Sequence, residues 1–443
     1  DTEPAEVYVI GNPPYLGSRN QDAEQKSDLE LVFKKDYKSL DYVSIWFYKG
    51  AKYIEGINAQ LAFVSTNSVC QGLLVALTWQ RILNDKIEIG FAYQSFKWTN
   101  NARGNAGVTV IIVGLRNKSA KPKLLFTESV ANEAKNINAY LLDAPDIYIE
   151  GRTKSISNFP TMLFGNMPND GGNLLFDEKE YKAFIVEFPK SLKFFKKYVG
   201  AHDFLNGGGR YVLNIENEDL EEAKEIVEID NRLNNVYQHR IKSSEKSTRE
   251  KAKHPNQFYF FSHKETDSII VPRHSSETRD YIPLGFFNSD TIIADSAMAI
   301  YDAQPWLFGV LHSKMHMVWV DAVGGKLETR YRYSAKLCYN TFPFPELNAK
   351  QKETITQYVF SVLDERAKFP EKTMAWLYNP ETMPKGLKQA HHELDLAIER
   401  IYRLAPFTSD EERLAFLFKM YEEMTNRESL FAKEKPLRKK KKR

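Results

Sequence analysis

The segment Asn12-Pro13-Pro14-Tyr15 combines residue types that together could bind and activate a planar amine. The two prolines fix their own φ angles and lack N–H groups, so the segment cannot satisfy its carbonyl groups internally. An exocyclic amine on an aromatic base donates two hydrogens, and the Asn12 side-chain oxygen and the Pro13 carbonyl could accept both. Those bonds would raise the nucleophilicity of the nitrogen towards a methyl donor, while Tyr15 stacks on a base flipped out of a nucleic-acid helix.

The elements that must position this segment have an α/β pattern. Strand-like runs occur at 7–10, 60–65, 87–92 and 108–113, and helical patterns occur at 42–54 and 67–83. The apolar run 108–113 is typical of a strand covered on both faces of a mostly parallel sheet. Asn-Pro-Pro-Tyr on its own is also a common turn. However, it directly follows the strand 7–10, and ligands of open α/β sheets bind beyond the carboxyl ends of strands.

A second pair of residues could read DNA sequence. Glu328 and Arg330 are two residues apart, so on a strand both side chains point to one face. Glu accepts a hydrogen bond from cytosine N4, and Arg donates in a bidentate manner to guanine, so the pair could read both halves of one base pair. Arg332 continues the same face and could contact phosphate. The alternative is a surface ion pair worth under about 1 kcal/mol.

The rest of the chain divides by composition. Residues 155–345 are rich in Tyr and Phe, with turn clusters and short strand patterns that predict an α+β domain, and residues 346–435 show helical spacing. Within the α+β domain, the polar stretch 241–257 is predicted to be a mobile loop. Its basic residues, with Arg240 before it, either grip phosphates or are simply solvated. Residues 436–443 are expected to form a disordered basic tail.

Charge and cysteine content narrow the class of protein. Six of the 61 basic residues occupy the last six positions, and the other 55 are outnumbered by 58 acidic residues, so DNA binding would need local clusters of charge. Cys70 and Cys338 alone build no disulfide framework, which indicates a reducing compartment, by default the cytoplasm. The longest clearly apolar run, 108–115, is far below the roughly 20 residues of a membrane span. We expect no export signal, because the amino terminus of this sequence is acidic.

No metal site is expected. His312 and His316 have the spacing of a zinc-binding helix, but Ser313 stands where a zinc peptidase would have its Glu base. Histidines with this spacing are more often ordinary core or surface residues.

The motifs match one family in order along the chain. The amino-terminal matches are Gly11-Asn12-Pro13-Pro14-Tyr15-Leu16-Gly17, Leu40-Asp41-Tyr42, Ser65-Thr66-Asn67-Ser68 and Phe96-Lys97-Trp98. The later ones are Ser313-Lys314-Met315-His316, Gly325-Lys326-Leu327-Glu328-Thr329-Arg330-Tyr331-Arg332, Leu377-Tyr378-Asn379-Pro380 and Ala390-His391-His392-Glu393-Leu394-Asp395. With these motifs the chain resembles the S-adenosylmethionine-dependent amino-methyltransferases, and among them the MmeI-like type IIL restriction-modification enzymes.

The resemblance implies a fold and a function for the whole chain. Residues 1–120 would be the carboxyl part of a Rossmann-like methyltransferase sheet, 155–345 a DNA target-recognition domain and 346–435 a helical carboxyl-terminal region. The activity implied is adenine-N6 methylation of double-stranded DNA with S-adenosyl-L-methionine as cofactor. The catalytic residues would be Asn12, Pro13, Pro14 and Tyr15, with Phe96 and Trp98 lining the base pocket and Glu328, Arg330 and Arg332 recognising DNA.

One departure from the family limits what this chain would do alone. The family binds the methyl donor with a glycine-rich turn that normally precedes Asn-Pro-Pro-Tyr, and only eleven residues precede Asn12 here. We therefore expect a carboxyl-terminal portion that needs a missing amino-terminal part and is inactive in isolation. Two alternatives stay open: a DNA-specificity module without catalysis of its own, and a protein-glutamine or RNA methyltransferase.

Overall fold

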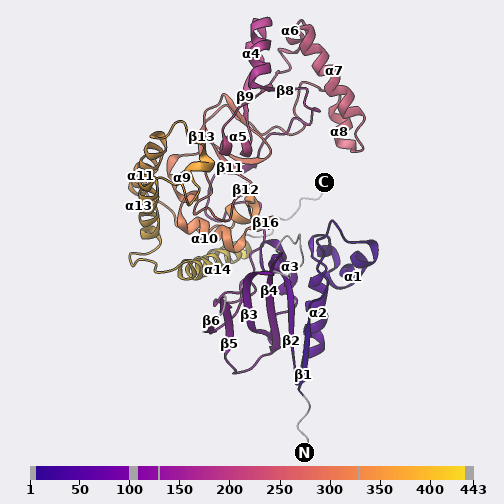
Figure 1. Cartoon of the computed structure of the whole chain (residues 1–443), viewed down its shortest axis with the longest axis vertical. Coiled ribbons are helices and arrows are strands. Elements are labelled where there is room, and N and C mark those ends of the chain that lie inside the picture. The colour runs from indigo at the N-terminus through magenta and orange to yellow at the C-terminus, as the bar shows by residue number, and fades with distance from the viewer. Residues whose placement is uncertain (1–5, 99–107, 128–129, 328–329, 435–443) are drawn as a thin grey trace, which may run out of the picture. The chain divides into compact units, whose positions relative to one another are not determined.

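The computed structural model describes residues 6–98, 108–127, 130–327 and 330–434. The chain forms two compact units, each built from segments that are distant in sequence (Figure 1). The first unit contains Asp1–Ile156, Val318–Pro343 and Phe407–Arg443, and the second contains Ser157–Met317 and Phe344–Pro406. No helix in the described part of the chain is both long enough and apolar enough to cross a bilayer.

A six-stranded mixed sheet forms the centre of the first unit. Its strands are β1 (Val7–Gly11), β2 (Ala59–Thr66), β3 (Ile87–Trp98), β4 (Val108–Asn117), β5 (Lys123–Thr127) and β6 (Val130–Ala134), in the order β1-β2-β4-β3-β5-β6. β1 is parallel to β2, and β3 is parallel to β5. β4 is antiparallel to both of its neighbours. The expectation of a mostly parallel sheet around 108–113 is therefore wrong, although α/β organisation is confirmed.

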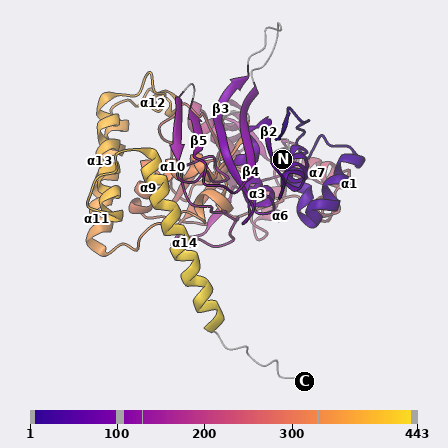
Figure 2. The same ribbon diagram turned by 90° about the horizontal axis from the view of Figure 1, so that it is seen from below.

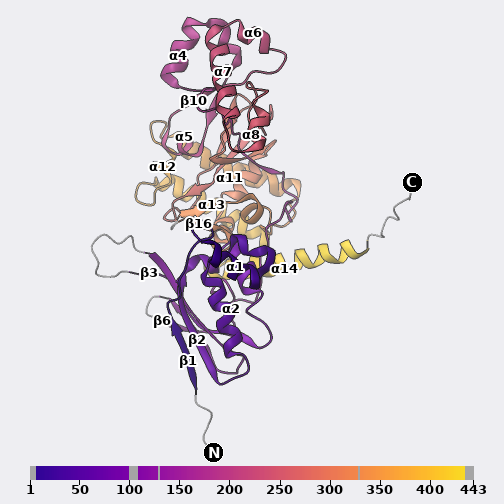
Figure 3. The ribbon, with the colours of Figure 1, turned by 90° about the vertical axis from the view of Figure 1, so that its right-hand side faces the viewer.

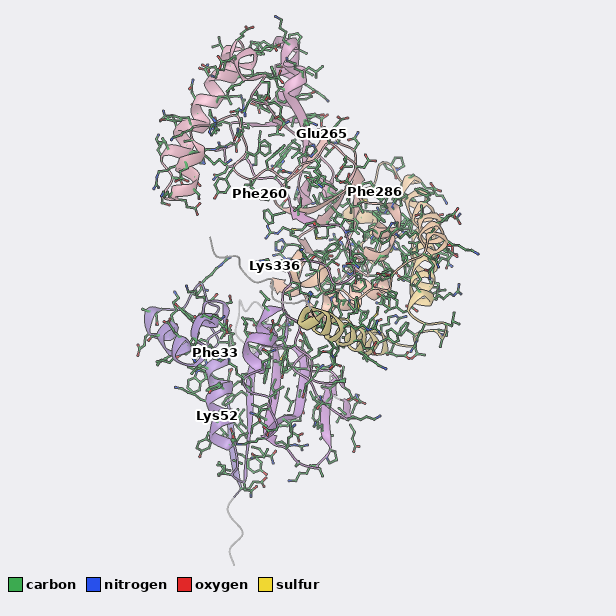
Figure 4. The ribbon with its side chains drawn as sticks, turned by 180° about the vertical axis from the view of Figure 1, so that it is seen from behind. Phe33, Lys52, Phe260, Glu265, Phe286 and Lys336 are labelled. Carbon is green, nitrogen blue, oxygen red and sulfur yellow. The ribbon has the colours of Figure 1, made fainter. Side chains whose placement is uncertain are left out.

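Helices pack on one face of this sheet. They are α1 (Ala23–Phe33), α2 (Val43–Ile54) and α3 (Leu73–Trp79), with the 3-10 helices η1 (Lys34–Ser39) and η2 (Asn67–Cys70) beside them. Alternate residues of β2 are buried on the helix side, where Phe63 meets Phe47 of α2 with ring centroids 5.5 Å apart. Phe33, at the end of α1, lies against Tyr48 of α2 with centroids 5.9 Å apart (Figure 4). Figure 3 shows α1 and α2 to one side of the strands.

Segments from the carboxyl half complete the first unit. They are the hairpin of β16 (Gly325–Leu327) and β17 (Arg330–Arg332), the π-helix η4 (Ala335–Tyr339) and helix α14 (Asp410–Glu434), which is one continuous helix (Figure 2). The Trp319 ring packs against Phe342, Phe418 and Tyr421, with ring centroids between 5.7 and 6.4 Å apart. A buried aromatic cluster therefore joins three distant parts of the sequence.

The second unit contains two four-stranded sheets and most of the helices. One sheet has the order β14-β9-β10-β8 and the other β13-β11-β15-β7. The strands are β7 (Met162–Phe164), β8 (Leu175–Asp177), β9 (Phe195–Val199), β10 (Arg210–Leu213), β11 (Ser268–Pro272), β13 (Gly285–Phe287), β14 (Thr291–Ile293) and β15 (Ala297–Tyr301), and β12 (His274–Ser275) lies outside these two sheets. The helices are α4 (Glu178–Glu187), η3 (Pro189–Phe194), α5 (Ala201–Asn206), α6 (Leu220–Lys224), α7 (Val227–Ile241), α8 (Lys246–Lys251), α9 (Pro305–Leu311), α11 (Ala349–Ala367), α12 (Met374–Leu377) and α13 (Lys385–Tyr402), with α10 (Lys314–Val323) at the boundary in sequence. The expected α+β domain followed by helices is confirmed.

The polar stretch 241–257 is ordered, which corrects the prediction of a mobile loop. It contains α8 and a series of turns, and Arg240 at the end of α7 holds them in place. The Arg240 side chain is fully buried and donates to five backbone carbonyls at distances between 2.7 and 3.2 Å. Those carbonyls belong to Pro168, Asn169, Lys251, His254 and Gln257. Arg240 is thus not available for phosphate contact, because every donor of its guanidinium is used inside the unit.

A buried polar network ties α9, α11 and α13 together in the second unit. Arg366 donates to the Tyr378 hydroxyl at 2.6 Å and lies 3.2 Å from His312 Nδ1, and the Tyr378 hydroxyl lies 2.9 Å from His391 Nε2. Burial lowers the pKa of both histidines well below the usual value, so they are neutral. His312 and His316 are both buried, and the described residues contain no group of three or more His, Cys, Asp or Glu arranged to hold a metal ion.

Asp395 is a second buried acid–base feature of this region. Its carboxylate accepts hydrogen bonds from the Tyr281 hydroxyl and the Lys314 N–H, both at 2.6 Å. Burial nevertheless raises the pKa of Asp395 to about 7, because these two donors only partly offset the loss of solvation.

We predict that Arg240→Met lowers the free energy of unfolding by about 3 kcal/mol or more, because five backbone carbonyls lose their only side-chain donor. Urea denaturation followed by circular dichroism measures the change. Lys242→Met is the matched control, since Lys242 is exposed two residues further on, and it should change stability by less than about 0.5 kcal/mol. Equal stability of the Arg240→Met and wild-type proteins would contradict the structural role.

Asp395→Asn should change how stability depends on pH. The unfolded carboxyl loses its proton near pH 4 and the folded one near pH 7, so the folded state holds the extra proton between these values. Wild-type stability therefore falls, relative to Asp395→Asn, as pH rises from 4 to 7, with a slope of up to about 1.4 kcal/mol per pH unit. Urea unfolding of both proteins at pH 5, 6 and 7 tests this, and the histidine titrations cancel in the comparison. Parallel stability profiles would refute it.

Candidate active site

The Asn12-Pro13-Pro14-Tyr15 segment, hereafter the proline loop, begins directly after β1 and lies beyond the carboxyl end of that strand. Pro13 is buried, Asn12 is exposed, and 37% of the Tyr15 surface is exposed. Within the described part of the chain, no residue forms a hydrogen bond with the Asn12 side chain. The loop therefore presents its amide oxygen unpaired, as amine binding requires.

The residue after the proline loop, Leu16, is held through both of its backbone polar groups. Its N–H donates to Asp41 Oδ1 at 2.9 Å. Its carbonyl accepts from Gln21 Nε2 at 2.8 Å and from the Tyr42 N–H at 3.0 Å. Gln21 uses its second amide hydrogen on the Leu40 carbonyl at 2.9 Å. Leu16 is thus fixed by residues on both sides of α1.

Asp41 and Gln21 are both buried, with 9% and 5% of their surfaces exposed. Asp41 Oδ1 also accepts the Val43 N–H at 3.1 Å, at the first turn of α2. Loss of solvation raises the pKa of Asp41, and the bonds from Val43 and Leu16 oppose this shift. Sequence reasoning missed these roles: Leu40-Asp41-Tyr42 stood out only as a family motif, and nothing in the local sequence marks Gln21.

The two aromatic residues predicted for a base pocket lie at the same end of the sheet as the proline loop. Phe96 of β3 pairs with Val110 of β4, which pairs with Thr66 at the end of β2. Phe96 is half-buried, and the side chain of Trp98 lies outside the described residues. Because β3 is three strands from β1, Phe96 is about 14 Å across the sheet from the loop's strand. The sheet therefore does not bring Phe96 next to Asn12.

Arg330 and Arg332 lie on one face of β17, both exposed, with Tyr331 between them on the other face. Glu328 lies outside the described residues. The hairpin comes close to the start of α3: a Cβ on Gly72 would lie only 3.3 Å from the Gly325 Cα. Gly72 also has φ +60°, so glycine is required there for its backbone conformation as well as for space. The two arginines thus belong to the same compact unit as the proline loop.

Comparison with known families assigns this chain to the MmeI family. The profile of the MmeI DNA-methyltransferase domain matches residues 1–127, that of the MmeI target recognition domain matches 143–346, and that of the MmeI C-terminal domain matches 347–428. The three profiles follow the order of the family's domains. The chain therefore belongs to the MmeI family, as the sequence motifs predicted.

Two relatives give the extent of the similarity. The chain is 48% identical over 425 residues to DNA methyltransferase A of Bacillus subtilis (strain 168), which covers 95% of this chain and 48% of that protein. It is 40% identical, with a TM-score of 0.86, to the solved structure of the type IIL restriction-modification enzyme MmeI in complex with DNA. That match covers 95% of this chain and 57% of the MmeI chain. The chain thus spans about half the length of the relatives it matches.

Proposed function

We propose that this chain is the carboxyl-terminal part of a DNA adenine-N6 methyltransferase that belongs to a restriction-modification enzyme. In this proposal the chain supplies both the amine-binding loop and the recognition of the DNA sequence. The observation that carries the proposal is the proline loop, whose Asn12 oxygen is unpaired at the carboxyl end of β1. The similarity to a solved MmeI–DNA complex supports DNA as the substrate.

The proposed chemistry follows from the geometry of the loop. Asn12 Oδ1 and the Pro13 carbonyl accept the two hydrogens of the adenine N6 amine, which places the nitrogen lone pair away from both acceptors. Tyr15, which is partly exposed, stacks on the flipped base. Pro14 keeps the backbone between these groups rigid, so little motion is needed when the base enters.

S-adenosyl-L-methionine would supply the methyl group when bound, but this chain offers only part of its site. The sequence lacks a strand followed by a glycine-rich turn and a helix, the arrangement that holds such cofactors. We propose that an amino-terminal part of a longer polypeptide provides it. One face of β1 supports this, because the large side chains of Tyr8 and Ile10, which alternate along the strand and so share that face, are 61% and 80% exposed.

For DNA recognition, we propose that Glu328 and Arg330 read one base pair in the major groove and that Arg332 contacts phosphate. The exposure of both arginines on one face of β17 supports this. The absence of the cofactor turn from this sequence favours one second candidate, a DNA-specificity module that acts without catalysis of its own.

Asn12→Ala in the full-length enzyme should abolish methylation, because the amine loses one of its two acceptors. DNA affinity should stay within about three-fold, since phosphate and base contacts elsewhere supply most of it. Transfer of labelled methyl groups and an equilibrium DNA-binding assay measure the two properties. Asn132→Ala changes an exposed amide side chain on β6 that, like Asn12, has no hydrogen-bond partner within the described residues, and serves as the matched control. Methylation by Asn12→Ala at the wild-type rate would sink the catalytic assignment.

The double substitution Glu328→Lys with Arg330→Asp should change the base recognised at one position of the target. Selection of bound duplexes from a random DNA pool, at about 0.15 M salt and with residues 438–443 removed to suppress non-specific attraction, reads out the sequence. The wild-type chain should enrich a short asymmetric sequence containing adenine. An identical sequence enriched by both proteins would refute the assignment. No enrichment by a folded wild-type chain would mean that recognition either needs the amino-terminal part or is directed at RNA or protein.

A further inference from the structure

The proline loop cannot hold its own shape by hydrogen bonds. Pro13 and Pro14 have no N–H to donate, and within the described residues the Tyr15 N–H forms no hydrogen bond. Leu16 is therefore the first residue after the prolines whose backbone N–H is bonded. Both backbone polar groups of Leu16 are engaged by buried side chains from outside the loop. The orientation of Tyr15, and of the carbonyls before it, is therefore set by whatever holds Leu16.

The groups that hold Leu16 are costly to bury. Asp41 is a carboxylate with 9% of its surface exposed, and no basic side chain forms an ion pair with it within the described residues. A buried carboxylate without a cationic partner is unfavourable unless its hydrogen bonds are needed. Gln21, 5% exposed, directs both amide hydrogens at backbone carbonyls, those of Leu16 and Leu40.

We propose that Asp41 and Gln21 are positioning residues for methyl transfer, which act by fixing Leu16 so that the Asn12 oxygen, the Pro13 carbonyl and Tyr15 meet the amine and base in one geometry. This inference rests on the proposed function of the loop. It assigns no contact with the substrate to either residue. Their contribution is pre-organisation, which lowers the cost of reaching the reactive arrangement once the base has entered.

The experiment combines kinetics of the full-length enzyme with hydrogen–deuterium exchange of this chain. Asp41→Ala should lower kcat about 30-fold and leave the KM for DNA within about two-fold, because a displacement of about 1 Å in a reactive geometry is costly while DNA contacts are unchanged. Asp41→Asn should restore kcat to within about three-fold of wild type, because its Oδ1 still accepts both N–H groups. Exchange in a peptide covering residues 12–20 should be faster in Asp41→Ala and unchanged in Asp41→Asn.

Two further variants keep the test decisive. Gln21→Met leaves Asp41 in place and removes both donors to the carbonyls, so it should also lower kcat, by about 10-fold, if Asp41→Ala fails to fold. Thr78→Val is the matched control. It removes the 3.1 Å hydrogen bond between the buried hydroxyls of Thr78 on α3 and Ser44 on α2, and neither hydroxyl is bonded to Leu16 or the loop. Its kcat should equal that of wild type.

The outcomes separate this inference from the proposed function. If Asn12→Ala abolishes methylation but Asp41→Ala and Gln21→Met keep the wild-type kcat, the positioning role is overturned and the function stands. If Asp41→Asn loses as much kcat as Asp41→Ala, hydrogen-bond acceptance is not the cause and the inference fails. Unchanged exchange of residues 12–20 in Asp41→Ala would overturn it without reference to activity. If the Asn12→Ala enzyme still methylates DNA at the wild-type rate, both the proposed function of the loop and this inference are refuted.

Discussion

The lack of backbone donors in Pro13 and Pro14 is the constraint on which the amine-binding region depends. A loop without internal hydrogen bonds must be fixed by hydrogen bonds from other parts of the chain. Asp41 lies 25 residues after Leu16 in sequence, and the intervening segment, which includes α1 and η1, folds so that Asp41 contacts Leu16. The buried cluster of Leu29, Phe33, Leu40 and Ile45 stabilises that segment. The apolar core of α1 and α2 thus supports the geometry of a polar loop.

Much of the site could be predicted from sequence because its signals are local. Asn12 to Tyr15 follow a β-branched run directly, and a strand followed by a proline-rich polar loop needs no tertiary information to recognise. Gln21 and Asp41 carry no such signal, since their importance lies in contacts between residues five and 25 positions apart. For Arg240 the sequence left two alternatives, a phosphate contact and a solvated side chain. The fold shows neither, because five backbone carbonyls surround its buried guanidinium.

The topology was predicted less well than the fold class, for a physical reason. The run 108–113 of β4 is buried on both faces, since the neighbouring residues Val110 and Ile111, which point to opposite faces, are both buried. Burial on both faces gives the same composition to parallel and antiparallel strands, so strand direction is not encoded in it. Direction follows from the connections: β3 and β4 are neighbours in sequence and pair antiparallel, whereas β1 and β2 are separated by α1 and α2 and pair parallel.

Under the proposed function, the position of the β16–β17 hairpin relates the residues that recognise the DNA sequence to the loop that binds the adenine amine. Its glycines come close to Gly72 at the start of α3, and α3 follows the strand next to β1. Arg330 and Arg332 therefore belong to one compact unit with Asn12, although about 320 residues separate them in sequence. A side chain at Gly72 would push the hairpin away from α3, because its Cβ would lie only 3.3 Å from the Gly325 Cα. The spacing between the base that is read and the adenine that is methylated would then be set by backbone contact between glycines, and not by a flexible linker.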